Sequence, residues 1–221
     1  MYYPRRRWAL FIMLSHEQKQ RGASLIELMI AMALGLGSLS VIATVIGYGI
    51  GANGKLLANS RLSEEINAVG SLITRDIKRA GYSADTIALV TDPTASPSAF
   101  ANSLVVSRHP DEIAESCIVF AYDRNSNGLL DTVGGNENFG FRLRSGAVEI
   151  RKAGAACADG GWENLTDVDM VTITELSFSL TQTTFNTVVS TQVNVSIVGE
   201  LAANDNFSRQ YSTGFLVRNY D

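Results

Sequence analysis

The sequence lacks the residues from which most enzyme sites are built. It has two histidines and two cysteines among 221 residues. His16 precedes a long apolar segment, and His109 stands beside Pro110, which is typical of a solvated loop. The sequence pattern indicates no Ser/His/Asp set, metal-ligand cluster or glycine-rich phosphate loop. We therefore expect a protein that is not an enzyme.

An excess of basic charge is also missing. The net charge is −4 at pH 7, whereas nucleic-acid-binding domains are usually basic. We expect no direct binding of nucleic acid. The N-terminal segment is basic although the whole chain has a net negative charge. Residues 1–22 contain one acid, Glu17, and five basic residues: Arg5, Arg6, Arg7, Lys19 and Arg21.

Charge is absent altogether from Leu28 to Ile50. An apolar run of this length can cross a bilayer as a helix. Basic residues precede it, so the positive-inside rule places the N-terminus in the cytoplasm and the rest of the chain outside. A secretory signal peptide fits less well, because its apolar region is shorter and a small-residue cleavage site follows it. Here the small residue, Gly22, comes before the run.

A lone carboxylate, Glu27, lies at the start of this apolar segment. A plain membrane anchor explains the length of the segment but not this residue, because an ionised carboxylate in hydrocarbon is costly. Ionisable groups in such segments are functional candidates by default.

The stretch KQRGASLIEL, residues 19–28, resembles the class III signal of type IV pilins and pseudopilins. The resemblance implies that a prepilin peptidase cuts between Gly22 and Ala23 at the cytoplasmic face, and that Ala23 is then N-methylated. Ala23 stands where the family usually has Phe, whereas Glu27 matches the family's glutamate. Residues 1–22 are then a leader peptide. A start at Met13 gives a shorter polar leader, so residues 1–12 are interpreted as an upstream-start artefact.

Cleavage would give Glu27 a partner. The new α-amino group of Ala23 is the nearest cation, and in a filament the carboxylate of one subunit can pair with the amine of a neighbour. A paired charge is tolerated in a low-dielectric environment where a single one is not. Glu27 is therefore predicted to set the register of packing helices during assembly.

The helical pattern continues beyond the apolar run. Apolar residues recur at steps of three and four, which marks one face of a helix: Leu57, Leu62, Ile66, Val69, Leu72, Ile73 and Ile77. We expect one helix from about residue 24 to 79, ended by Gly81. Residues 23–52 would form a transmembrane and filament-core half, and residues 53–81 an amphipathic half. The glycines at 35, 37 and 47–51 either permit close helix packing or loosen the helix.

From residue 101 onward the apolar pattern changes to a period of two, which predicts strands. The expected strands cover residues 103–109, 116–123, 139–145, 147–152, 170–181, 187–199 and 208–218, with a tight turn at Ser145-Gly146. Residues 82–102, with Pro93 and Pro97, are expected to form a loop. The prediction is an α+β pilin-like fold, with the long helix packed on an antiparallel sheet. Residues 82–221 would be a β-rich domain outside the cytoplasm.

Several short motifs resemble those of the PilW-like minor pilins, and their order along the chain carries the likeness. They are DIKRAGY (76–82), CIVFAYD (117–123), FGFRL (139–143), Trp162 with LTD (165–167), and VRN (217–219).

Two cysteines in a domain outside the cytoplasm commonly form a disulfide. Cys117 and Cys157 are predicted to pair, and two buried thiols are the alternative. The stretch from Asp123 to Asp131 raises the possibility of calcium binding, because Asp123, Asn125, Asn127, Leu129 and Asp131 match positions 1, 3, 5, 7 and 9 of an EF-hand loop. Gly134 replaces the glutamate at position 12, although Glu137 is close enough in sequence to substitute. A polar hairpin loop that binds nothing is the alternative.

The resemblance to pilins implies a minor pilin of the type IV pilus that primes assembly or occupies the tip. Adhesion and twitching motility would be properties of the whole filament. The expected partners are other pilin subunits, prepilin peptidase and the inner-membrane assembly platform. The protein would start as a single-pass inner-membrane protein and end in a pilus at the cell surface. A type II secretion pseudopilin and a membrane-anchored periplasmic binding domain that never assembles are the alternatives.

Overall fold

The computed structural model describes residues 22–85, 91, 98–186 and 188–217. The predicted leader up to Arg21, the predicted start at Met13, the two prolines Pro93 and Pro97 of the predicted loop, and Arg218 and Asn219 of the last motif lie outside the described residues. The chain divides into two compact units, residues 1–52 and residues 53–221. Each unit is described separately below.

The first unit contains the apolar part of helix α1 (Leu25–Ile77). All described side chains of this unit are exposed, including Leu28, Ile30 and Leu34. The helix is long and apolar enough to cross a bilayer, with a mean hydropathy of 2.2 in its most apolar stretch. It continues without interruption through Gly47, Gly49 and Gly51. An exposed apolar surface of this extent requires lipid or other helices around it.

In the second unit the last part of α1 packs on a sheet through one face. Its buried side chains recur at helical spacing and include Leu62, Ile66, Ile73 and Ile77, each at most 1% exposed. Full burial of one such side chain contributes about 1.5–3 kcal/mol. Gly70 lets the helix approach the sheet closely, because a Cβ at this position would overlap the ring of Tyr211.

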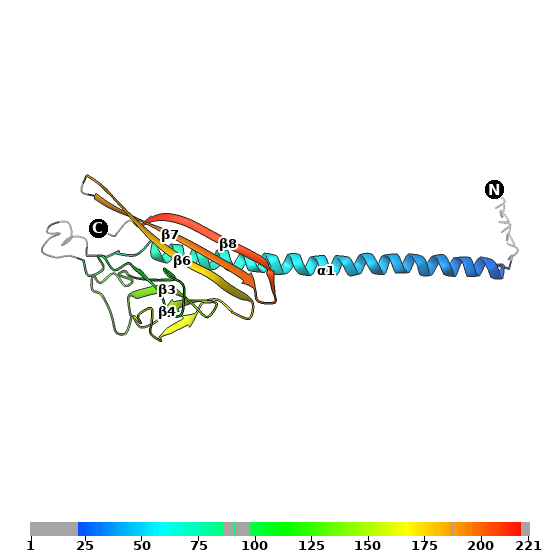
Figure 1. Ribbon diagram of the computed structural model, residues 1–221, viewed down its shortest axis with the longest axis horizontal. Coiled ribbons are helices and arrows are strands. Elements are labelled where there is room, and N and C mark those ends of the chain that lie inside the picture. Colours follow the sequence, from blue (N-terminus) through cyan, green and yellow to red (C-terminus); the bar gives the residue numbers. More distant parts are fainter. Residues whose placement is uncertain (1–21, 86–90, 92–97, 187, 218–221) are drawn as a thin grey trace, which may run out of the picture. The chain divides into compact units, whose positions relative to one another are not determined.

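The described strands form two antiparallel sheets, which Figure 1 shows on the same unit. One has five strands in the order β1 (Val105–Ser107), β2 (Cys117–Ala121), β3 (Asn138–Arg144), β4 (Ala147–Arg151) and β5 (Trp162–Asn164). The other has three longer strands in the order β6 (Val171–Phe185), β7 (Val188–Leu201) and β8 (Asn204–Val217). Side chains of α1 and of both sheets share one hydrophobic core.

The predicted helix and α+β fold are confirmed, with differences in detail. The structure has two antiparallel sheets where one was expected. Strand β5 was not predicted, because three residues are too few to show a period of two. The predicted turn at Ser145-Gly146 joins β3 to β4, and both residues have positive φ, 48° and 79°. This is the backbone of a type I′ hairpin turn, in which glycine is favoured.

Candidate functional site

The predicted cleavage junction lies directly before the helix. Gly22, Ala23 and Ser24 are not helical, and α1 begins at Leu25, with the amide of Leu28 donating to the carbonyl of Ser24 at 3.1 Å. A Cβ at Gly22 would meet no heavy atom of the described residues within 4 Å, and the φ of Gly22 is not in the left-handed region. The described part of the fold therefore gives no reason for glycine at position 22. Recognition by another protein would supply such a reason.

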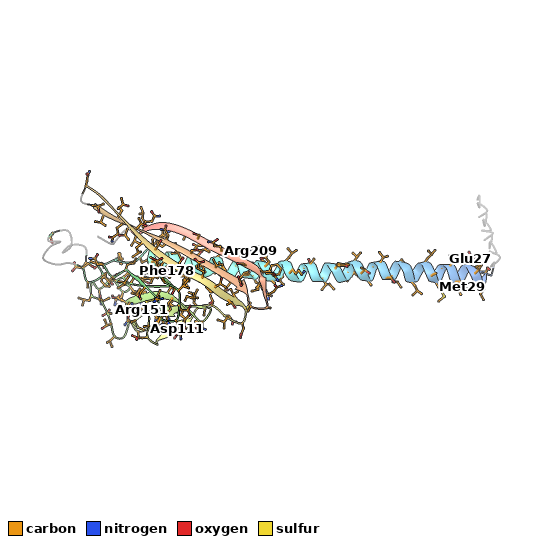
Figure 2. The ribbon with its side chains drawn as sticks, viewed as in Figure 1. Glu27, Met29, Asp111, Arg151, Phe178 and Arg209 are labelled. Atoms are coloured by element: carbon orange, nitrogen blue, oxygen red, sulfur yellow. A yellow bond between two sulfur atoms is a disulfide. The ribbon has the colours of Figure 1, made fainter. Side chains whose placement is uncertain are left out.

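Glu27 lies in the first turn of α1, as Figure 2 shows. Its side chain is exposed, and no ion pair or hydrogen bond joins it to the residues described in this structure. A carboxylate at a helix N-terminus is favoured by the helix dipole. That contribution is small beside the cost of placing an unpaired charge in hydrocarbon. A cationic partner outside the subunit would remove that cost.

The serine and threonine side chains at 38, 40 and 44, further along the apolar half, make bonds within the helix. The hydroxyls of Ser38, Ser40 and Thr44 donate to the carbonyls of Gly35, Leu36 and Ser40 at 2.8–3.0 Å. Hydroxyls bonded in this way can face lipid without an unmet donor. Glu27 is the one charged side chain among the described residues from 24 to 54.

The predicted disulfide between Cys117 and Cys157 is confirmed. Cys117 lies on β2 and is fully buried, and Cys157 lies in the loop between β4 and β5. The bridge closes a sequence separation of 40 residues, which corresponds to about 4 kcal/mol in the chain-entropy model.

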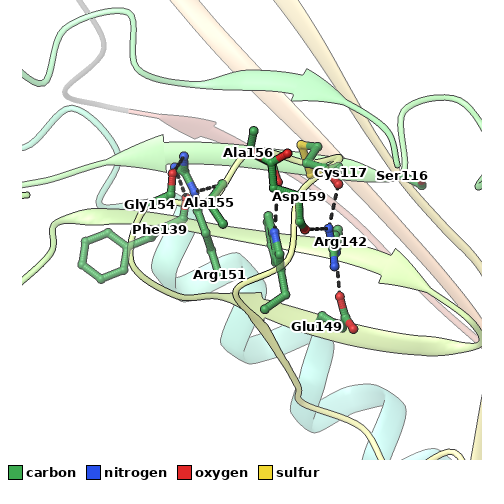
Figure 3. The surroundings of a disulfide bond; sticks show 12 residues. Ser116, Cys117, Phe139, Arg142, Glu149, Arg151, Gly154, Ala155, Ala156 and Asp159 are labelled. Carbon is green, nitrogen blue, oxygen red and sulfur yellow. Dashed lines mark hydrogen bonds and ion pairs between the residues drawn. A yellow bond between two sulfur atoms is a disulfide. The ribbon is translucent and has the colours of Figure 1, made fainter. Parts of the chain in front are cut away.

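The loop that carries Cys157 depends on arginines that the sequence analysis did not single out. Its residues 153–161 are Ala, Gly, Cys and a single Asp, so the loop has few side chains with which to pack. Arg142 faces Cys117 across β2 and β3, and it donates through Nη1 to the carbonyls of Cys157 and Asp159 at 2.7 and 2.8 Å. Its Nε is 2.6 Å from Oε2 of Glu149, and its guanidinium carbon lies 4.6 Å from the centre of the Trp162 ring. Figure 3 shows Arg142 with Glu149 and Asp159 beside the disulfide.

Arg151 holds the other side of the same loop. It donates through Nε to the carbonyl of Ala155 at 2.6 Å and through Nη2 to that of Gly154 at 2.7 Å (Figure 3). Burial lowers the pKa of this guanidinium from its ordinary value, but arginine stays charged at every physiological pH. The sequence does show a loop of small residues around Cys157. That pattern does not reveal which arginines contact the loop.

The predicted calcium loop folds around hydrogen bonds. Asp123, 1% exposed, accepts from the backbone amides of Ala84, Asn127 and Gly128 at 2.9–3.2 Å. Burial alone raises the pKa of Asp123, but these amide donors together outweigh it and the pKa is lowered. The side-chain amides of Asn125 and Asn127 both donate to Oδ2 of Asp131, at 2.6 and 3.0 Å.

Glu137 closes the loop through hydrogen bonds to backbone amides, and its predicted role as a substitute calcium ligand stays a prediction. Its side chain is fully buried, with Oε1 accepting from the amides of Arg124 and Asn125 and Oε2 from the amide of Asp131. Within the described ranges, no group of three or more His, Cys, Asp or Glu side chains is placed to hold a metal ion. Calcium binding at Asp123, Asn125, Asn127, Leu129 and Asp131 stays a prediction. Calorimetric titration tests it, since heat at millimolar calcium supports it and no heat contradicts it.

Comparison with known proteins gives two matches to protein families. The model of the family described as prepilin peptidase-dependent protein B matches residues 55–217. The model described as the prokaryotic N-terminal methylation motif matches residues 18–46. A similar curated protein is prepilin peptidase-dependent protein B of Escherichia coli (strain K12), 26% identical over 162 residues, which cover 70% of this chain and 75% of that protein. No solved structure matches.

Proposed function

Because the chain belongs to the prepilin peptidase-dependent protein B family, we propose that it is a minor pilin of a type IV pilus, cut after Gly22 and built into or beneath the filament. One observation carries the proposal. Gly22 and Ala23 lie directly before an apolar helix whose first turn contains Glu27, within the segment that matches the N-terminal methylation motif.

The chemistry of this junction supports each step of the proposal. The non-helical backbone at Gly22 and Ala23 is compatible with extended binding in a peptidase site. Cleavage there creates the α-amino group of Ala23, which is the cation that Glu27 lacks within its own subunit. N-methylation of that amine leaves its charge in place. The pair between Glu27 and a neighbour's Ala23 then favours packing in one register.

The apolar helix and the second unit are both consistent with insertion in the membrane followed by assembly into a filament. The apolar helix and the methylation motif indicate membrane anchoring. We place the second unit in the periplasm before assembly and at the cell surface afterwards, because basic residues precede the helix and the unit contains a disulfide. The proposed partners are prepilin peptidase, the inner-membrane assembly platform, and major and minor pilin subunits. PilW-like identity, adhesion and twitching motility stay predictions.

Mass spectrometry of filaments sheared from the cell surface tests the assembly role. We expect peptides of the second unit in the sheared fraction, and we expect them to disappear when prepilin peptidase is deleted. A chain found only in the membrane fraction of pilus-bearing cells would contradict the proposal. That result would favour the membrane-anchored binding domain, whereas co-purification with secretion subunits alone would favour the type II secretion pseudopilin.

A further inference from the structure

The second unit carries opposite charges at two places along α1. Toward the start of its helical segment, Glu64 and Glu65 lie beside a groove. About three turns later α1 ends at Ile77, with Arg75 in its last turn and Lys78 and Arg79 directly after it. The segment from Arg75 to Arg79 is called the basic end of α1 below. About 13 residues separate Glu65 from Lys78, which is about 20 Å along a helix. The second unit therefore has an acidic surface at Glu64 and Glu65 and a separate basic surface at Arg75, Lys78 and Arg79.

The acidic groove has a volume of about 570 Å³ and lies between α1 and the segments around β6 and the β7–β8 turn. Four carboxylates line it, those of Glu64, Glu65, Asp167 and Asp169, together with one cation, Arg61. The larger apolar side chains in the lining are those of Leu62, Met170, Val171 and Leu201. Met170 is half exposed although it is large and apolar. The lining thus combines apolar area with a net negative charge.

Within the described residues, the four carboxylates have no ion pair. Glu64 accepts from the hydroxyl of Ser60 at 3.2 Å, and Asp167 accepts from the amide of Asp169 at 3.0 Å. The ion pairs found among described residues involve other side chains, around Arg142, Arg144 and Lys152. A cationic group brought by a partner would meet a rim whose net charge is negative.

The basic end of α1 offers such a group. Arg75, Lys78 and Arg79 are exposed, and Asp76 is the acid among them. Nζ of Lys78 lies 5.3 Å from the centre of the Phe215 ring, and the guanidinium carbon of Arg79 lies 4.2 Å from that of Tyr122. These aromatic contacts limit the side-chain freedom lost on binding. Leu216, 57% exposed, lines the same shallow groove as Lys78 and adds apolar surface.

We propose that the acidic groove of one subunit receives the basic end of α1 of a second copy of this chain. The contact is heterologous, with different surfaces on the two copies. Both copies keep their α1 helices pointing the same way, as subunits anchored in one membrane must. The inference rests on the proposed function, because it names a contact between subunits that assemble.

Photo-cross-linking of the full-length chain tests this contact. A photoreactive residue replaces Ala68, an exposed residue that lines the groove, in one tagged copy, which is expressed with a differently tagged copy in the cells that encode the protein. We expect an adduct of two copies whose cross-link maps to residues 75–82 of the second copy. A cross-link to a different protein, or to another part of the second copy, would overturn the proposal.

Charge reversal supplies the matched comparison. E64K/E65K in the photoreactive copy should lower the adduct yield by about tenfold, as expected when several charge pairs at one contact become repulsive. K78E/R79E in the other copy should restore most of the yield, because the pairs are then reversed and attractive again. Glu175→Lys, at an exposed glutamate outside the groove, should leave the yield unchanged. Loss without restoration by the reversed partner contradicts the pairing.

The two proposals fail in different ways. Processing at Gly22 and recovery in sheared filaments are measured in the same cells. If the chain is processed and assembled but gives no adduct at residues 75–82, the charge contact is wrong and the pilin role stands. If the chain is not processed or assembled, the pilin role itself fails.

Discussion

At the residue scale, buried carboxylates rather than apolar contacts shape the Asp123–Glu137 region. Asp123 and Glu137 are both almost fully buried, and backbone amides are their hydrogen-bond donors. A buried carboxylate is tolerated when several N–H groups compensate for lost water. The segment therefore depends on the charge of these side chains as well as on their shape.

Glu137→Gln tests this dependence. The substitution keeps the shape but removes the charge and sets an NH2 group against backbone donors. We expect the free energy of unfolding to fall by about 1.5–3 kcal/mol, the range for hydrogen bonds to charged groups. Urea denaturation measures it, with Glu175→Gln as the exposed control, which should change stability by less than about 0.5 kcal/mol. An unchanged midpoint for Glu137→Gln would refute the account of this segment.

Asp76 is a carboxylate in an unfavourable place. It lies in the last turn of α1, where the helix dipole disfavours negative charge. Burial raises the pKa of Asp76 despite the nearby charges of Arg75 and Arg79. Because the pKa of Asp76 is higher in the folded state than in the unfolded state, ionisation of Asp76 lowers the free energy of unfolding. This loss is complete above the folded-state pKa and vanishes below the unfolded-state pKa of about 3.9.

Asp76→Asn should therefore stabilise the protein at pH 7, by about 0.3–1 kcal/mol. The gain should shrink to nothing at pH 3, where the carboxyl is neutral in both states. Thermal unfolding at the two pH values measures this. A variant that is less stable than the parent at pH 7 would show that Asp76 makes a favourable ion pair instead.

At the element scale, the helix and the long strands could be predicted from sequence because each has a clear apolar period. Leu62, Ile66, Ile73 and Ile77 follow the helical spacing, and alternate residues of β7, such as Val193, Val195 and Ile197, are buried. Strand β5 could not be predicted, since it owes its pairing to β4 and not to its own pattern. The division into two sheets depends on long-range pairing, which local periodicity does not encode.

Some residues of the candidate site could likewise be predicted from the sequence, and others could not. Gly22, Ala23 and Glu27 could be named because the signal is contiguous in sequence. The pairing of Cys117 with Cys157 could be predicted because the chain has two cysteines. The contacts of Arg142 and Arg151 could not, because they join a strand to a loop through backbone carbonyls, and any residue offers a carbonyl.

The disulfide loop gives a prediction at this scale. Replacing both cysteines, C117S/C157S, should lower the free energy of unfolding by about 4 kcal/mol, within the usual range of 2–5 kcal/mol. The double variant leaves no free thiol to form other bridges. Urea denaturation of the variant and of the oxidised parent under the same conditions measures the difference. A loss below about 1 kcal/mol would mean that the arginine contacts alone hold the loop.

At the scale of the whole molecule, helix α1 supplies both an apolar segment in the first unit and part of the core of the second unit. The first unit has an exposed apolar surface with a single carboxylate in its described part, and the second unit has a conventional core. Such a division suits a subunit that is stored in a membrane and later packed against other helices. We propose that the charge of Glu27 matters in the second setting, where a neighbour's amine would be available.

The Glu27→Val variant tests whether Glu27 is needed for assembly into filaments but not for retention in the membrane. The variant keeps a long apolar segment, so we expect it to remain in the membrane at the parent level. We expect its recovery in sheared filaments to fall by about tenfold or more, because a buried charge pair loses one partner. Quantitative mass spectrometry of both fractions measures this, with Glu17→Val in the leader as the control. Equal recovery of Glu27→Val and the parent would contradict the role given to the carboxylate.

The central claim is that the chain is cut after Gly22 to create the amine that Glu27 requires. Mass analysis of the N-terminal peptide of the chain purified from cells with prepilin peptidase tests it most directly. The account predicts a peptide that begins at N-methylated Ala23, and an uncut leader in cells without the peptidase. A chain that still begins at Met1 or Met13 in peptidase-positive cells, or one cut at another bond, would contradict it.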